Sequence, residues 1–171
     1  MKKITFRPPR PTDFEALYRY AKTIEAEDTF ITLSPDEPLT KKAEREHFQT
    51  DLKKIKQNNK VITCVFDGKK MIGSCGVERQ GRRSRHLGEI GIALLKEYRS
   101  EGLGKKLFSY TLKQARKKLK LTTAILQCMA ENKVALAFYK KMGFKQYGRL
   151  PKANRYKGRL IAAIYFYQHL K

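Results

Sequence analysis

Apolar residues recur along this chain at helical spacing in some segments and in alternation in others, and the changes between the two patterns mark its elements. The first helical stretch, residues 13–26, starts at Thr12 and Glu15, which are spaced as in a capping box. Its repeating apolar positions, which we expect in the core, are Phe14, Leu17, Tyr18, Ala21 and Ile24. The whole pattern predicts, in chain order, a strand, two helices, three strands, a helix, a strand, a helix and two strands.

The boundaries of these elements define a fold class. The expected strands cover residues 4–7, 61–66, 71–78, 87–95, 122–129 and 160–169, with a short one at Phe144. The expected helices cover residues 13–26, 41–57, 102–118 and 132–142. Strands should pair in parallel around the third helix, because a crossover connection imposes that direction. We therefore expect an α/β (α+β) fold with a mixed, mostly antiparallel sheet of six to seven strands and about four helices, in one domain of residues 1–171.

A turn sequence at residues 67–70 joins two β-rich runs and predicts a hairpin. If the chain turns at Gly68 and Lys69, Cys64 faces Gly73 while Cys75 faces Ile62, so the two cysteines are not cross-strand partners. The three cysteines of the chain show no C-x-x-C spacing either, which argues against a disulfide framework and a zinc site. We expect three reduced thiols that serve as small core residues.

The net charge of +22 is carried by residues 52–171, whereas residues 1–51 are close to neutral. Such a field favours a polyanionic partner, which could be a nucleotide coenzyme, a nucleic acid, the ribosome or an anionic membrane surface; charge alone does not choose among them. The chain has neither a secretory leader pattern nor an apolar run long enough to span a bilayer, so we expect a cytoplasmic protein without a membrane partner. The three histidines lack ligand spacing, and no metal is expected.

The segment 98–104 follows a predicted strand and opens a predicted helix. Gly102 and Gly104 remove side chains where the backbone has to turn and approach a ligand. The first amide groups of the helix lack intrahelical partners, so with the helix dipole and with Arg99 and Lys105 nearby they make a site for a diphosphate. The plain alternative is a helix-start turn with solvated lysines. The segment is neither a Walker loop nor a complete G-x-G-x-x-G fingerprint.

This turn resembles the coenzyme-binding turn [RQ]-x-x-G-x-[GA] of the GCN5-related N-acetyltransferase (GNAT) family, which residues 99–104 match in full. A second resemblance lies in residues 132–144, which look like the helix N-x-x-A-x-x-[FL]-Y-x-x-x-G-F of that family. The two motifs are one strand and one helix apart, and the resemblance is strong over residues 88–144. It departs from the family near the end, where Ala162 and Ala163 replace a common acidic pair.

The resemblance implies a fold and a reaction. The sheet should split after the strand at residues 87–95, and the pantetheine arm of acetyl-CoA should lie in the opening against unpaired backbone. The implied activity is transfer of an acetyl group from acetyl-CoA to a primary amine in a ternary complex; the residues leave open whether the acyl group is longer. The implied coenzyme contacts are Ile92, Ala93, Leu94, Arg99, Ser100, Glu101, Gly102, Leu103, Gly104, Lys105, Asn132 and Tyr139.

Two side chains are candidate catalytic groups for amide formation. Glu89 would accept the proton of the attacking amine directly or through a water, with a pKa raised by partial burial. It is equally an ordinary strand glutamate, and other family members place this base on the next strand, where Gln127 stands. Tyr139 matches the family position of the acid that protonates the departing thiolate, or else it packs in the core. Asn132 is expected at the coenzyme amide, or as a helix N-cap alone.

The distribution of charged residues suggests both the kind of acceptor and the rival functions. Acidic residues in an otherwise basic protein could attract a cationic amine at the mouth of the site, or could be ordinary helix-end carboxylates; they are Glu25, Glu27, Asp28, Asp36 and Glu37. Two basic clusters favour a ribosome- or nucleic-acid-binding protein, or are solvated faces; they are Arg82, Arg83 and Arg85, and Lys117, Lys118 and Lys120. A non-catalytic acyl-CoA binder of the same fold is a third possibility. Both a monomer and a homodimer remain open.

Overall fold

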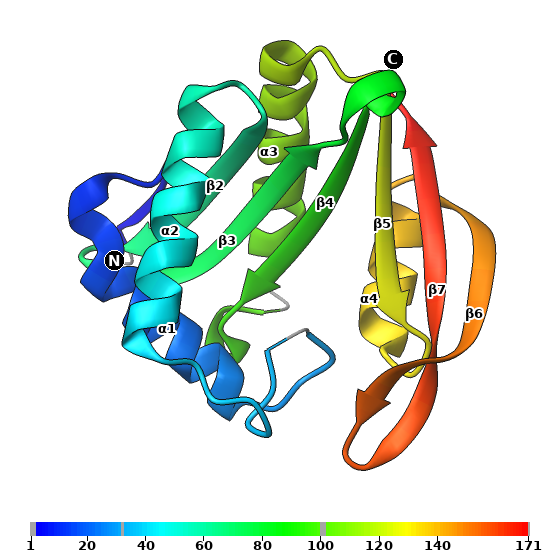
Figure 1. Cartoon of the computed structure of the whole chain (residues 1–171), viewed down its shortest axis with the longest axis horizontal. Helices are drawn as coiled ribbons and strands as arrows, with labels where there is room; N and C mark the ends of the chain where they lie inside the picture. Colours follow the sequence, from blue (N-terminus) through cyan, green and yellow to red (C-terminus); the bar gives the residue numbers. More distant parts are fainter. Residues whose placement is uncertain (1–2, 32, 100–101, 171) are drawn as a thin grey trace.

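The computed structural model describes residues 3–31, 33–99 and 102–170, and one seven-stranded sheet organises them (Figure 1). Its strands are β1 Ile4–Arg7, β2 Lys60–Asp67, β3 Lys70–Arg79, β4 Leu87–Leu94, β5 Thr123–Met129, β6 Lys145–Tyr156 and β7 Arg159–His169. Its helices are α1 Phe14–Ala26, α2 Lys41–Lys56, α3 Leu103–Leu119 and α4 Lys133–Lys141. The strand order is β1-β2-β3-β4-β5-β7-β6, and β4–β5 is the parallel pair in an otherwise antiparallel sheet. The predicted fold class is confirmed.

Helices cover the two faces of the sheet unequally (Figure 1). Helices α1 and α2 lie over β2 and β3 on one face, whereas α3 and α4 lie on the other. The main core forms between α3 and the central strands, where Leu107 and Phe108 are fully buried with Ile72 and Val77. No helix of the described residues covers β5, β7 and β6 on the face of α1 and α2, so this part of the sheet is open (Figure 1).

The sheet opens within β4. The parallel ladder joins only Leu87–Glu89 of β4 to residues 123–125 of β5, and beyond it the two strands diverge (Figure 1). The opening expected from the resemblance, beside backbone at Ile92 and Leu94, is therefore present, and it starts just beyond Glu89.

The last hairpin is longer than the sequence predicts. The short strand expected at Phe144 is wrong: β6 is a strand of 12 residues that starts at Lys145 and pairs with β7. It is an edge strand with mostly exposed side chains, Pro151 lies inside it, and its register with β7 shifts twice. These features remove the alternation of apolar and polar residues by which a strand is recognised in sequence, because neither face of β6 is buried.

Two local details also differ from expectation. A bulge between Val65 and Phe66 moves the β2–β3 register by one residue, so Cys64 lies opposite Ser74 and not Gly73. The cysteines are still not partners, and all three are free and buried.

The capping box is not the start of α1. A 3₁₀ turn, Pro11–Asp13, precedes the helix, and the Asp13 carboxylate accepts the Arg10 amide at 2.7 Å. Glu15 instead pairs with Lys41 of α2 at 2.9 Å. Of the five apolar positions expected in the core, three are buried, and Leu17 and Tyr18 are half-buried.

Candidate active site

The glycine turn before α3 has the geometry that the sequence suggests. Gly102 has φ 75°, in the left-handed region where residues with a side chain are strained. The Lys106 amide donates to the Gly102 carbonyl at 3.2 Å, which leaves the three preceding amides of the first helical turn without intrahelical partners. A Cβ at Gly104 would lie 3.4 Å from the Leu94 side chain, so α3 approaches β4 closely here. Ser100 and Glu101, also expected to contact the coenzyme, lie outside the described residues.

The edge of β4 that faces the opening carries backbone groups with no strand beside them. The Leu87 carbonyl accepts from Gln80 at 3.0 Å, and the Leu95 amide donates to Ile72 at 2.9 Å. Residues at odd positions of β4 therefore turn their backbone polar groups toward β3, because these directions alternate along an antiparallel pair. Ile92 and Leu94 point theirs into the opening, where β5 has already diverged.

The alternation separates Ala93 from the other expected coenzyme contacts. Its backbone groups are directed toward β3, opposite Ser74. Its carbonyl also accepts the Tyr20 hydroxyl of α1 at 3.0 Å. Ile92 and the Leu94 amide thus have backbone groups free for an added strand, whereas those of Ala93, and the Leu94 carbonyl that accepts Arg99 Nε, are engaged within the protein.

The side chain of Arg99 is engaged within the protein as well. Its Nε donates to the Leu94 carbonyl at 2.8 Å, and its Nη2 donates to Oε2 of Glu27 at the end of α1. The other carboxylate oxygen of Glu27 accepts the Lys96 amide at 2.9 Å. Glu27 and Arg99 therefore form a latch that ties α1 to the end of β4 and to the start of the coenzyme turn.

Tyr139 lies on α4 in a buried aromatic cluster. Its ring is 5.9 Å from that of Phe108, 6.3 Å from that of Phe144 and 6.2 Å from that of Phe166, measured between centroids. Desolvation raises the pKa of its phenol well above the usual range, so the group stays protonated. Burial also raises the pKa of the Cys128 thiol to about 11, which leaves it neutral and poorly nucleophilic.

Asn132 caps α4. Its Oδ1 accepts the Ala135 amide at 3.1 Å, as the sequence predicts for an N-cap. The half-buried side chain keeps its amide NH₂ free of any partner within the described part of the chain, so capping does not use the donor that a coenzyme carbonyl would need.

Glu89 lies where β4 and β5 part, on the face of α1 and α2. Its neighbours across the sheet in the same row are Glu78 of β3, Ile125 of β5 and, one strand further, Tyr167 of β7. The expected partial burial is wrong, because Glu89 is exposed, and its one polar contact among the described residues is Gln80 Nε2 at 3.4 Å. It lines a hollow with Lys60, Gly76, Glu78, Arg79, Gln80, Gly81 and Gly91.

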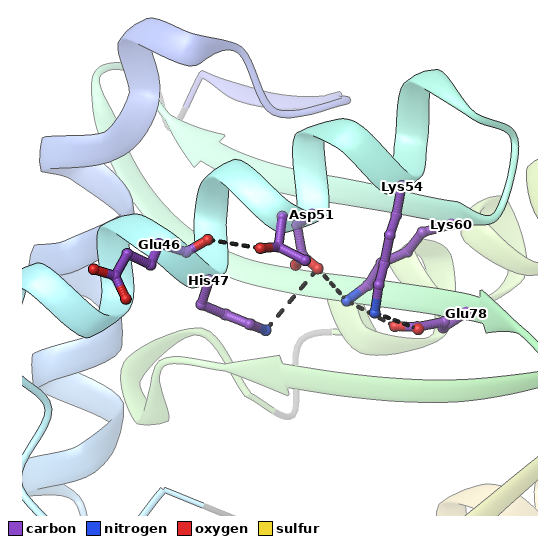
Figure 2. A network of polar contacts seen from close by, with 7 residues as sticks. Glu46, His47, Asp51, Lys54, Lys60 and Glu78 are labelled. Atoms are coloured by element: carbon purple, nitrogen blue, oxygen red, sulfur yellow. Dashed lines mark hydrogen bonds and ion pairs between the residues drawn. The ribbon is translucent and has the colours of Figure 1, made fainter.

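The wall of this hollow is a network of ion pairs, shown in Figure 2. Lys60 contacts the buried Asp51 at 2.6 Å and Glu78 at 3.2 Å, and Lys54 reaches Glu78 at 2.5 Å. Desolvation alone would raise the pKa of Glu78, but the two lysines outweigh it and lower that pKa. The charge of Glu78 is neutralised by its partners, whereas Glu89 has no cationic partner among the described residues.

Most of the acidic residues that could have attracted a cationic amine are already paired within the protein. Glu25 is buried, pairs with Lys22 at 2.8 Å and accepts the Leu39 amide at 3.4 Å. Glu27 belongs to the latch, and Asp28 lies 3.4 Å from Lys157. The expectation that these three carboxylates are free to attract a cationic amine is therefore wrong. Only the remaining two, Asp36 and Glu37, are exposed and form no ion pair with the rest of the described chain.

Aromatic residues two and three strands away from Glu89, on the same face of the sheet, were not identified from the sequence. The rings of Tyr165 and Tyr167 on β7 each lie 6.0 Å from that of Tyr147, on the open face of the sheet. The ring of Tyr156, at the hairpin tip, lies 4.5 Å from that of Phe30 in a tilted arrangement. The Tyr156 hydroxyl donates to the Asp28 carbonyl at 3.1 Å, so the hairpin reaches the α1–α2 loop across the opening. The alternating tyrosines of the last strand, Tyr165 and Tyr167, were the sequence pattern from which this surface could have been predicted.

Comparison with known proteins gives this architecture a family. Residues 3–145 match the family model described as an acetyltransferase (GNAT) domain. This chain therefore belongs to the GNAT acetyltransferase family, which makes it an acyltransferase by class. No curated protein matches it.

Solved structures share the fold over the whole chain. A GNAT-family acetyltransferase from Streptococcus pneumoniae has a TM-score of 0.87 and 22% identity, covering 98% of this chain and 100% of that one. A ribosomal-protein-alanine N-acetyltransferase from Brucella melitensis has a TM-score of 0.82 and 18% identity, covering 97% and 99%. A putative acetyltransferase from Salmonella typhimurium, solved with acetyl-CoA, has a TM-score of 0.82 and 15% identity, covering 98% and 94%. At these identities the likeness establishes the fold.

Two further observations concern membranes and metals. Within the described ranges, no helix is both long enough and apolar enough to cross a membrane. The same residues contain no group of three or more histidine, cysteine or acidic side chains placed to hold a metal ion.

Proposed function

We propose that this chain transfers an acetyl group from acetyl-CoA to a primary amine in a ternary complex. The observation that carries the proposal is the meeting of two sets of unpaired backbone groups at one opening of the sheet. These are the edge of β4 at Ile92 and Leu94 and the first amides of α3 after Gly102. The first set suits the amide-bearing pantetheine arm, and the second suits the pyrophosphate.

The latch changes how Arg99 serves this site. Because its guanidinium is held by Glu27 and the Leu94 carbonyl, we assign Arg99 to shaping the turn. The charge for the pyrophosphate then comes from the amides of α3 and from Lys105 and Lys106, which show no ion pair in the described structure.

Glu89 is the proposed proton acceptor. An attacking amine has to lose a proton, and a lysine-like amine is mostly charged at neutral pH. Glu89 is a carboxylate with no cationic partner among the described residues, at the point where the thioester would meet an acceptor. Its exposure favours relay through a water or transfer during acceptor binding, when the amine covers the carboxylate. The Ile92 or Leu94 amide would stabilise the developing oxyanion.

Tyr139 is proposed to stabilise the leaving sulfur. Burial raises its pKa above that of a thiol, which is about 8.5, so complete proton transfer to the thiolate is uphill. The buried phenol instead acts as a hydrogen-bond donor to the sulfur, a role in which a high pKa keeps the proton available.

The acceptor class that we favour is an amine on a protein. Solved neighbours of this fold include enzymes described as acting on ribosomal proteins, from Brucella melitensis and Vibrio fischeri. The open sheet face with Tyr147, Tyr165 and Tyr167 offers an extended surface across β5 from Glu89, on which a peptide has more to contact than a small amine has.

A transfer assay tests this function. Purified protein is incubated with acetyl-CoA and, in parallel, with peptides bearing a free N-terminus, with lysine peptides blocked at the N-terminus, and with small amines. We expect coenzyme thiol release coupled to acetylation of at least one peptide class, read by mass spectrometry, and a slower rate for Tyr139→Phe with unchanged acetyl-CoA affinity. Acetyl-CoA binding without transfer to any amine would instead favour the non-catalytic binder.

A further inference from the structure

Two basic clusters that are far apart in the sequence meet at one end of the sheet. Arg82, Arg83 and Arg85 lie in the β3–β4 connection, and Lys117, Lys118 and Lys120 lie at the end of α3. The His86 carbonyl accepts the Thr122 amide at 3.0 Å and the Thr123 amide at 3.2 Å, which joins the two connections. Figure 1 shows both at the end of the sheet where β4 and β5 are paired, away from the opening. We call these six residues the basic end.

The charges of the basic end are not neutralised within the protein. All six side chains are exposed, and none forms an ion pair with any other described residue. Some cations elsewhere in the chain are paired, for example Lys54 and Lys60 with Glu78 and Arg99 with Glu27. Six like charges at one end repel one another, and an external polyanion relieves that repulsion.

We infer that the basic end docks the protein on the phosphate backbone of double-helical RNA. Arginine forks and lysines neutralise phosphates, and the release of counterions from the nucleic acid supplies the affinity. Contacts of this kind suit a duplex, which exposes its phosphates while its bases stay stacked inside. The choice of RNA rests on the proposed function, because an acceptor on a ribosomal protein is surrounded by RNA.

The helix dipole does not explain the whole basic end. Lysines in the last turn of α3 are favoured there by the dipole, which accounts for Lys117 and Lys118. The arginines lie in a connection with a short 3₁₀ turn, Arg82–Ser84, where no long helix ends. The dipole therefore does not account for three arginines at that position, which supports a separate partner.

The location of the basic end leaves the transfer site free. The opening at Ile92 and Leu94 and the turn at Gly102 lie toward the other end of β4 (Figure 1). RNA bound at the basic end and acetyl-CoA in the opening therefore bind together, and acetyl-CoA does not displace the RNA.

Backbone geometry allows variants that remove charge and keep the fold. Arg82 and Lys120 have φ 50° and 53°, in the left-handed region where glycine is less strained. R82G therefore removes a charge without a structural cost, and R83Q and R85Q complete the first triple variant. K117Q, K118Q and K120G form the second. The matched control removes three exposed, unpaired lysines of α2 with K42Q, K53Q and K56Q, so the net charge falls equally.

The test is fluorescence anisotropy with a labelled RNA duplex over a salt series, together with a DNA duplex of the same sequence and vesicles of anionic lipid. We expect each cluster triple to reduce the slope of log K against log salt by about 2 to 3, and the control to leave it nearly unchanged. RNA should bind more tightly than DNA, and saturating acetyl-CoA should not compete.

Several outcomes overturn the inference. If the control and the cluster variants had equal effects, the net charge of the protein alone would explain RNA binding. Equal binding of DNA would remove the choice of RNA, and binding to vesicles without RNA binding would assign the surface to a membrane. Absence of RNA binding at physiological salt would remove the dock altogether. Acetyl-CoA titration of the same preparation tests the proposed function separately, because neither measurement requires the other ligand.

Discussion

The two sides of the sheet opening are built from different kinds of contact. The side made by β4 and the start of α3 offers backbone groups, at Ile92, Leu94 and the amides after Gly102. The side made by α1, its following loop and the face around Glu89 is organised by side-chain ion pairs such as Glu27–Arg99. Backbone contacts depend on local conformation, whereas the ion pairs depend on residues far apart in the chain. Substitutions on the first side should therefore act on acetyl-CoA binding directly, whereas those on the second side should act on turnover or stability, or on binding only through the turn that Arg99 shapes.

The largest expected effect separates two neighbouring carboxylates. Glu89→Gln should reduce kcat/KM about a thousandfold, since general-base catalysis contributes on that order. Acetyl-CoA affinity should not change, because Glu89 lies on the acceptor face. The matched variant Glu78→Gln sits in the same row but is neutralised by two lysines, and its rate should fall less than about threefold. Equal losses in both variants would remove Glu89 from the chemistry.

The next effect concerns the coenzyme turn. Gly102→Val should weaken acetyl-CoA binding about a hundredfold, because a β-branched residue is strained at φ 75° and moves the first amides of α3. Calorimetric titration measures the affinity, and circular dichroism checks the fold. Gly81→Ala is the control, as its Cβ position is open and its φ is −91°. Unchanged affinity in Gly102→Val would argue against the turn as the pyrophosphate site.

A smaller effect tests how α1 is anchored. The Arg7 hydrogen bond lowers the pKa of Asp13, so this carboxylate stabilises the fold above its ordinary pKa of about 3.9 and loses that contribution as the pH falls through the lowered value. Asp13→Asn should cost about 2 kcal/mol of unfolding free energy at pH 7. Urea unfolding at pH 7 and pH 3 should show the cost shrinking at acid pH. The exposed Asp36→Asn should show no cost, and a cost that does not depend on pH in Asp13→Asn would contradict this assignment.

The smallest expected effect tests whether Glu27 holds Arg99 or attracts the acceptor amine. Glu27→Gln removes the charge that holds Arg99 and should weaken acetyl-CoA binding about fivefold, close to 1 kcal/mol, with little change in the acceptor KM. Glu37→Gln, exposed and without an ion pair in the described structure, is the control. A raised acceptor KM with normal acetyl-CoA affinity in Glu27→Gln would restore the idea that this carboxylate attracts the amine.

The same contrast explains what the sequence could predict. The parallel pairing around the third helix and the turn at Gly102 follow from periodicity, crossover rules and glycine placement, which are local properties, whereas the opening was expected only from the family resemblance. The role of Glu27 could not be predicted, because its partner Arg99 is 72 residues away and nothing in either segment specifies the pair. The exposure of Glu89 likewise depends on α2 stopping short of β4, and the length of β6 is hidden by its lack of a buried face.

The most direct test of the account is residue-resolved amide hydrogen exchange with and without acetyl-CoA. We expect alternation along β4: the Ile92 and Leu94 amides should become protected when acetyl-CoA binds, while those of Gly91 and Ala93, already directed to β3, should change little. Unchanged exchange at Ile92 and Leu94 under saturating acetyl-CoA, or equal change at all four amides, would contradict the proposal that this edge holds the coenzyme.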